Sequence, residues 1–177
     1  MSLRKLLLVA LLVAVARAED SPLARAKKGE WVLERYVVTY PGGQTTFHNY
    51  AWIDKVDGRK VTLKRQPVKD DGKTGLDAAR DKEIDLDKLA EAKGEKKVSE
   101  EELEVRGKKL KCRKVERTEP ADGPAKPVTI TWTSSDVPLY GKVREIAKDK
   151  DGKELSRMDL VDWGSDGGAA RDVDQKK

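Results

Sequence analysis

The sequence contains one cysteine, one histidine and one phenylalanine, and aromatic residues make up only 5% of it. Because Cys112 has no second cysteine to pair with, an intramolecular disulfide is excluded and the fold must be stabilised by packing. Cys112 follows Leu110 at strand spacing, which favours a buried small side chain over a reactive thiol or an intermolecular bridge. With His48 as the only imidazole, metal sites built from several histidines are excluded as well.

Familiar catalytic motifs are also lacking. The sequence has no HExxH, GxSxG, Walker or GxGxxG pattern. We therefore expect a protein that is not an enzyme and that needs no cofactor and no metal. Residues 149–152 (DKDG) lack the frame and the terminal glutamate of a calcium loop, so they predict a hairpin turn instead.

Long hydrophobic runs are absent except for residues 6–15, which follow Arg4 and Lys5 and precede Ala16-Arg17-Ala18. This arrangement predicts a signal peptide over residues 1–18, with Ala16 and Ala18 as the small residues recognised at the cleavage site. The run is too short for a comfortable membrane span. We therefore expect an exported mature chain, periplasmic or extracellular, with no transmembrane segment.

Positive and negative charges nearly balance once that peptide is removed. Charged residues make up 39% of the chain, and the formal net charge is +5. The first 18 residues carry three cations and no acid, so the mature chain carries +2. Interleaved lysines and acids of this kind give no concentrated positive field, which argues against nucleic-acid binding.

Strand patterns dominate what remains. Residues 128–133 (VTITWT) alternate strictly between apolar side chains and threonines, which is typical of a half-buried strand. Turn residues at 41–43, 57–58, 106–108 and 149–152 separate further runs of this type. The sequence predicts eight strands, over residues 31–40, 45–55, 61–65, 101–105, 109–116, 128–133, 139–148 and 155–163.

The strands at 31–40 and 45–55 have apolar side chains on both faces. Two interpretations follow: either these strands are central and covered on both sides, or the sheet is curved and its concave face is apolar as well. The predicted fold is mainly β, an antiparallel curved sheet or half-barrel of about eight strands with a short helix in a long insertion.

Domain boundaries follow from composition. Residues 19–164 form a single β-rich domain, in which the charged segment 66–97 is expected to be a mobile, partly helical insertion with its helix near residues 84–93. This segment could act as a lid or be a solvated insertion. The tail, residues 165–177, offers nothing to bury and is expected to be disordered.

The candidate ligand-binding residues are the aromatic side chains of the two-faced strands and of the strand at 128–133. In a small sheet such residues belong either to the core or to a pocket on an uncovered face. The predicted set is Trp31, Tyr36, Tyr50, Trp52 and Trp132.

Three short stretches carry a resemblance: RGKKLKC at 106–112, WTSSDVP at 132–138 followed by Gly141, and LVDWG at 160–164. They resemble a recurring pattern in uncharacterised exported proteins of planctomycete-type bacteria. The order of strands is similar, more distantly, to the half-barrels of lipoprotein-localisation factors. The resemblance implies export and a β fold, and it carries no catalytic residues.

The sequence thus favours an exported, non-enzymatic binding protein that holds an apolar ligand, such as lipid, or a lipidated partner protein against a concave sheet. The alternative is a structural or protein-interaction module of the bacterial cell envelope that buries both faces and binds through its edges. The two interpretations differ in whether one face of the sheet stays open.

Overall fold

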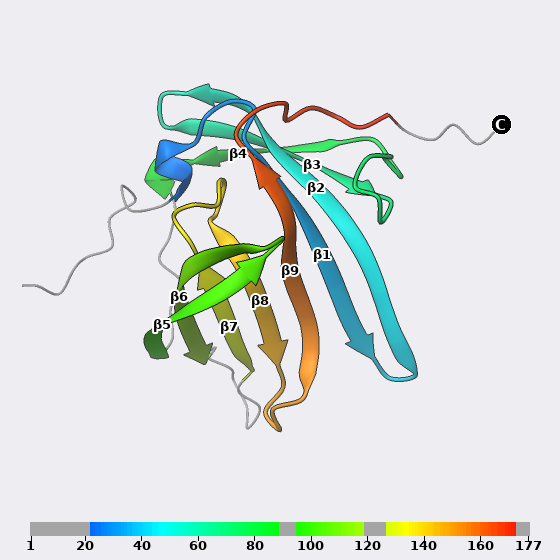
Figure 1. Cartoon of the computed structure of the whole chain (residues 1–177), viewed down its shortest axis with the longest axis vertical. Coiled ribbons are helices and arrows are strands. Elements are labelled where there is room, and N and C mark those ends of the chain that lie inside the picture. The colour runs from blue at the N-terminus through cyan, green and yellow to red at the C-terminus, as the bar shows by residue number, and fades with distance from the viewer. Residues whose placement is uncertain (1–21, 89–94, 119–126, 173–177) are drawn as a thin grey trace, which may run out of the picture.

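The computed structural model describes residues 22–88, 95–118 and 127–172 (Figure 1). Its nine strands belong to one open antiparallel sheet. They are β1 (Trp31–Tyr40), β2 (Gly43–Asp57), β3 (Lys60–Val68), β4 (Arg80–Asp85), β5 (Glu95–Val105), β6 (Lys108–Thr118), β7 (Val128–Thr133), β8 (Lys142–Lys148) and β9 (Glu154–Gly164). Helical structure in these residues is limited to two short 3₁₀ turns, η3 (Pro22–Arg25) and η4 (Leu86–Lys88), and neither could cross a membrane.

The sheet consists of two meanders, β1–β4 and β5–β9. They are joined where the first of these strands, β1, pairs with the last, β9. The spatial order of the sheet is β4-β3-β2-β1-β9-β8-β7-β6-β5, so every neighbouring pair except β1 with β9 is also consecutive in the sequence. The β5–β6 turn shows how local chemistry sets the hairpins. Arg106 and Gly107 both have positive φ, 51° and 75°, as a two-residue type I′ turn requires.

Register shifts curve this sheet. They occur in the pairings of β1 with β9, β2 with β3, β7 with β8, and β8 with β9. Such bulges bend a strand and increase its twist. The β5–β6 hairpin is consequently carried back towards β9 (Figure 1). There Arg106 forms an ion pair with Asp162, and Lys108 lies over the ring of Trp163. The predicted curved sheet or half-barrel is confirmed, with nine strands rather than eight.

A large hydrophobic cluster stabilises one face of β1–β4. This cluster includes Val32, Ala51 and Leu63 and extends to Ile130 and Trp132 of β7. Because side chains alternate along a strand, these positions define one face of β1–β4, which we call the inner face. Residues of η3 and of the connection before β8, among them Leu23, Val137 and Leu139, also pack into the large cluster.

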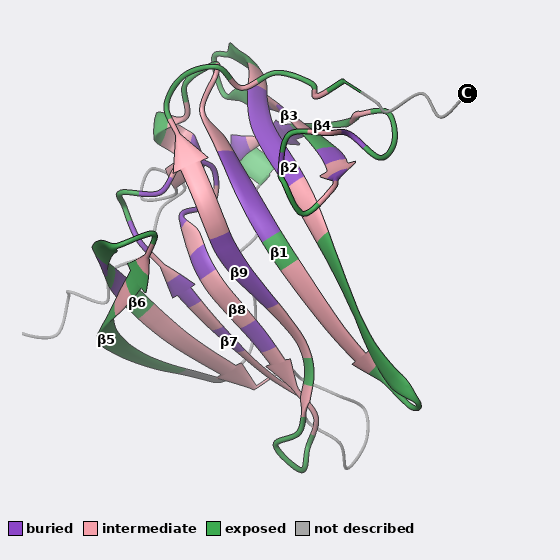
Figure 2. Cartoon of the chain, turned by 45° about the vertical axis from the view of Figure 1, so that its right-hand side comes forward, coloured by how far each residue is buried: buried purple, intermediate pink, exposed green. Residues whose placement is uncertain are grey.

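A second cluster lies on the opposite face of β1–β4, the outer face. It contains Leu33, Tyr50, Trp52 and Val68, with Trp31 packed against it. Figure 2 shows the buried residues of β1 and β2 concentrated in the half of these strands away from their hairpin. The two-faced pattern at 31–40 and 45–55 is therefore explained by central strands that are covered on both sides.

Two irregular segments cover the second cluster. In the loop between β3 and β4, Gly72 packs against the side chain of Leu33. The segment after β9 crosses the same face, where Gly168 contacts Trp52 and the guanidinium of Arg171 lies 4.0 Å from the ring centroid of Tyr50.

The segment 66–97 contains more strand than the sequence predicts. It includes the end of β3, all of β4 and the start of β5. Ile84 and Leu86 are buried, but they lie in β4 and η4 rather than on the expected helix, whose residues 89–93 are outside the described residues. Strand β4 was missed because Ile84 is its only apolar residue. The mobility of this segment stays a prediction.

The tail also differs from its prediction. Residues 165–172 are held on the sheet by the backbone hydrogen bonds from Gly168 N to Gly29 O and from Gly75 N to Asp172 O. Residues 173–177 lie outside the described residues. The tail binds because it covers apolar side chains of β1 and β2. The composition of the tail itself gives no sign of this contact.

Candidate functional site

The open part of the inner face begins where the large cluster ends. A cavity of about 530 Å³ lies there between β2, β3 and β4 on one side and the residues leading into β8 on the other. We call it the inner-face pocket. Its lining residues are Asn49, Leu63, Arg65, Pro67, Arg80, Asp81, Lys82, Tyr140 and Lys142.

Strand register places the cations of this pocket together. Arg65 of β3 is directly opposite Arg80 of β4, and Leu63 is directly opposite Lys82. Alternation therefore puts all three cations on the inner face, while Asp81, opposite Lys64, points to the other face. Like charges directly opposite each other on neighbouring strands destabilise a sheet.

Compensating acids are scarce around these cations. Among the described residues, no carboxylate lies within ion-pair distance of Arg65 or Lys82. Arg80 reaches only Asp77, at 3.8 Å between Nη2 and Oδ2. Lys142 is paired with Glu145 at 2.6 Å between Nζ and Oε2. The β3–β4 side of the pocket therefore carries an excess of positive charge.

Glu34 is the buried acid next to this pocket. It lies opposite Asn49, which is in turn opposite Pro67, and only 5% of its surface is exposed. The hydroxyl of Tyr36 donates a hydrogen bond to its carboxylate at 2.9 Å. Burial raises the pKa of Glu34, and the positive charges of Arg65 and Lys142 oppose that rise.

A partly exposed aromatic pair continues the same face towards the β1–β2 hairpin. Tyr36 is directly opposite Phe47, and their rings stack with centroids 5.1 Å apart. Phe47 is 39% exposed, and Tyr40 near the hairpin tip is 51% exposed. Desolvation by burial, together with the nearby carboxylate of Glu34, raises the pKa of the Tyr36 phenol.

The five predicted ligand-binding residues do not share one surface. Trp31, Tyr50 and Trp52 belong to the second cluster on the outer face, and the indole N–H of Trp31 donates to the carbonyl of Asp166. Trp132 is buried in the large cluster. Of the five, only Tyr36 lies beside the inner-face pocket. Contact between these residues and a ligand stays a prediction.

Trp132 has an electrostatic environment of its own. Its indole N–H donates a 2.8 Å hydrogen bond to Glu101, and the cationic groups of Lys114 and Arg144 lie 5.1 and 6.0 Å from its ring centroid. These contacts fix the indole between β6 and β8, so they are structural rather than part of an open site.

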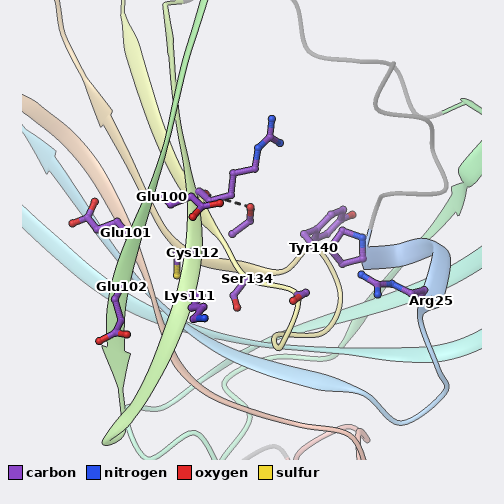
Figure 3. A pocket seen from close by; sticks show the side chains of 12 residues that line it. Arg25, Glu100, Glu101, Glu102, Lys111, Cys112, Ser134 and Tyr140 are labelled. Carbon is purple, nitrogen blue, oxygen red and sulfur yellow. Dashed lines mark hydrogen bonds between the residues drawn. The ribbon is translucent and has the colours of Figure 1, made fainter. Parts of the chain in front are cut away.

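A larger cavity, of about 780 Å³, lies along β5, β6 and the end of β7 (Figure 3). Tyr140 and Arg25 lie at one end, and Glu101 and Glu102 of β5 at the other. Unlike the inner-face pocket, this cavity has opposite charges facing each other: Glu100 is opposite Arg113, and Glu102 is opposite Lys111. Cys112 lines it, but its thiol donates to the carbonyl of Leu110.

The residues of the inner-face pocket were missed at the sequence level. Arg65 follows Val61 and Leu63 on one face of a strand, and Glu34 lies between Val32 and Tyr36 on one face of another. Charged residues in apolar alternation are the signal that could have identified them. The pairing of Arg65 with Arg80 could not be foreseen, because β4 itself was not recognised.

The fold and the pocket define this chain as an open antiparallel half-barrel with a cationic pocket on its inner face. Comparisons with protein families and with curated protein sequences give no match. Among solved structures, the fold is similar to that in the crystal structure of MucB in complex with MucA(peri), with a TM-score of 0.50 and 14% identity over 84% of this chain and 55% of the other. A complex structure of Pseudomonas aeruginosa MucA/MucB gives a TM-score of 0.49, 15% identity, and coverage of 86% and 58%. The chain thus spans little more than half the length of MucB, and the likeness is one of fold.

Proposed function

We propose that the mature protein is an exported, non-catalytic binding module that holds a segment of a partner protein against its inner face. The observation that carries this proposal is the inner-face pocket, where Arg65 and Lys82, for which the described residues supply no ion pair, lie near the stacked rings of Tyr36 and the exposed Phe47. Such an arrangement costs stability in the free protein and is expected where a ligand supplies the missing contacts. Support also comes from the MucB fold, which is solved in complex with MucA(peri).

The absence of a catalytic role is part of the proposal. Nucleophilic and acid–base catalysis require a nucleophile or acid within hydrogen-bond reach of a base. Besides the phenol of Tyr140, the ionisable groups of the pocket on the inner face are guanidinium and ammonium ions, and the carboxylate of Asp81 points to the other face. The nearby carboxylate of Glu34 accepts a hydrogen bond from a phenol whose own pKa is raised. These groups suit recognition better than proton transfer.

Site-specific photo-crosslinking tests the proposal. A photoreactive phenylalanine analogue in place of Phe47 should capture a discrete protein in the native cell envelope. The matched control is Leu76, which is 55% exposed in the loop that covers the outer face. Capture only at position 47 supports the proposal, whereas equal capture at both positions, or none at position 47, contradicts it.

An apolar ligand or a lipidated partner is the second candidate, favoured by the exposed rings of Tyr40 and Phe47. Native mass spectrometry of protein purified from its own envelope tests it. Co-purified lipid that is lost in the Phe47→Ser variant would support this candidate, and a clean protein mass would count against it. Lipid rather than protein recovered at position 47 would also reverse the order of the two candidates.

Export remains part of the proposal as well. Cleavage after Ala18 predicts a mature chain that begins at Glu19. The intact mass of the secreted protein checks this, and an uncleaved mass would contradict it. We likewise propose a relationship to the exported proteins of planctomycete-type bacteria, because three stretches of the sequence resemble them. A more distant relationship to lipoprotein-localisation factors is proposed because the order of strands resembles their half-barrel.

A further inference from the structure

We propose that the partner segment is acidic, and that its carboxylates bind to Arg65, Arg80 and Lys82 in the inner-face pocket. This inference rests on the proposed function and names the chemistry of the partner. It follows from a contrast within one pair of strands, β3 and β4, between cations that are compensated and cations that are not.

Away from the pocket, the cations of β3 have acids beside them. Lys60 pairs with Glu83 at 3.3 Å, and Lys64 pairs with Asp54 at 3.2 Å. Arg65, by contrast, lies directly opposite Arg80, and Lys82 lies two residues further along β4 on the same face. Among the described residues of this strand pair, Arg65 and Lys82 are thus cations without an acid within ion-pair distance, and Arg80 reaches only Asp77, at 3.8 Å.

The chemistry of these side chains selects the ligand. A guanidinium offers two parallel N–H donors that fit a carboxylate, and two neighbouring guanidinium groups favour a ligand with more than one negative group. The pocket lining also has an apolar part, because Leu63 and Pro67 lie on either side of Arg65 on the same face of β3. An extended segment that alternates acidic and apolar side chains satisfies both features, because its side chains alternate in the same way.

The fold supplies an entry for such a segment. Strand β4 is an edge strand of the sheet, so none of the described strands lies beyond Arg80 and Lys82 (Figure 1). Towards β1 the carboxylate of Glu34 borders the positive region, and Lys142 is already paired with Glu145. Electrostatics therefore directs a negatively charged ligand to the β3–β4 side of the pocket.

Fluorescence anisotropy with a defined probe tests the inference. The probe is a labelled peptide of alternating glutamate and valine, compared with the same peptide carrying glutamine in place of glutamate. The mature protein should bind the acidic peptide and not its neutral counterpart, and binding should weaken as salt is added. Arg65→Gln should weaken binding about tenfold, as expected for the loss of one charge-assisted bidentate contact.

Matched variants separate the effect of removing a charge inside the pocket from the effect of lowering the net charge of the protein. Arg65→Lys should retain part of the binding, because a point charge remains without the planar fork. Lys73→Gln removes the same charge from the loop over the outer face and should leave affinity unchanged. Arg65 and Lys73 are both exposed, and unchanged urea midpoints would verify that each variant is folded.

Each outcome has a distinct meaning. Equal binding of both peptides, or equal loss in the Arg65 and Lys73 variants, overturns the inference. Binding to vesicles that contain anionic phosphatidylglycerol, without binding to the peptide, overturns it in favour of a lipid surface. If photo-crosslinking at Phe47 captures a protein while the acidic peptide fails to bind, the proposed function stands and only the acidic partner is wrong.

Discussion

Glu34 shows how a single buried charge connects the core to the pocket. Only 5% of the surface of this residue is exposed, and the phenol of Tyr36 donates a hydrogen bond to its carboxylate. Because burial raises its pKa, the folded protein keeps the Glu34 proton at pH values where the unfolded chain has lost it. The unfolded state then binds fewer protons, so this residue lowers stability as pH rises above the ordinary range of a carboxyl.

We therefore expect Glu34→Gln to stabilise the protein at neutral pH. The gain should shrink as pH falls towards the ordinary carboxyl pKa, because glutamine does not titrate and can still accept from Tyr36. Urea unfolding at about pH 4 and about pH 8 measures the difference. The exposed Glu104→Gln variant is the control. A gain that is larger at the lower pH would contradict the assigned sign.

Cys112 is a buried side chain, as its spacing from Leu110 predicts. Only 2% of its surface is exposed, and burial raises the pKa of its thiol. Since the thiolate is the reactive species, we expect Cys112 in the native protein to react with Ellman's reagent at least about 100-fold more slowly than in the urea-unfolded chain. Rapid labelling of the native protein would show instead that this part of the sheet opens readily.

At the scale of elements, Gln66 ties two irregular segments to the outer face. Its side chain is 1% exposed. Its amide group donates to the carbonyls of Asp77 and Arg171, and its amide oxygen accepts from the backbone N–H of Arg171 at 2.7 Å. One buried side chain on β3 thus holds both the loop before β4 and the segment after β9.

Gln66→Leu should release these two segments. The substitution keeps much of the volume but leaves buried backbone groups without partners, at about 2 to 4 kcal/mol in unfolding free energy. Hydrogen exchange should accelerate in residues 165–172 and in the loop before β4, while the β6–β7 pair stays protected. Gln44→Leu at the β1–β2 hairpin is the control. Unchanged exchange in the tail would mean that Gln66 does not anchor it.

Local patterns were sufficient to predict the elements with strong alternation and clear turns. Strands β1, β7 and β9 fall where the sequence predicts them, because alternating apolar residues and Gly-containing turns are local features. Strand β4 and the bound tail could not be predicted in this way. Both depend on partners far away in sequence, Arg65 opposite Arg80 and Gln66 with Arg171. The inner-face pocket depends on the same long-range pairings. Of the residues in and around it, the sequence analysis therefore predicted only Tyr36 as a candidate ligand-binding residue.

At the scale of the whole molecule, one strand pairing holds the two meanders together. Strands β1 to β4 and β5 to β9 each follow the chain order, and β1 with β9 is the pairing that makes them one sheet. Met158 of β9 lies in this seam, opposite Tyr36 of β1 and Glu145 of β8, and is 3% exposed. The inner-face pocket spans the seam, since Lys142 belongs to one meander and Arg65 to the other.

Proline at position 158 should therefore affect the whole fold. It removes a ladder donor from a central strand and a buried side chain, at a cost of about 3 kcal/mol or more. The control is Glu83→Pro, because Glu83 lies on the edge strand β4, where its backbone has a strand neighbour on one side only, Thr62, although the substitution also removes the exposed ion pair with Lys60. Urea unfolding followed by tryptophan fluorescence should show a lower midpoint for Met158→Pro than for Glu83→Pro, together with a broadened or separated transition as the two meanders uncouple. Suppose that both prolines lower the midpoint equally and that the transition stays single and sharp. The pairing of β1 with β9 then does not determine the cooperativity of this sheet, and the inner-face pocket has to be assigned to the β1–β4 meander alone.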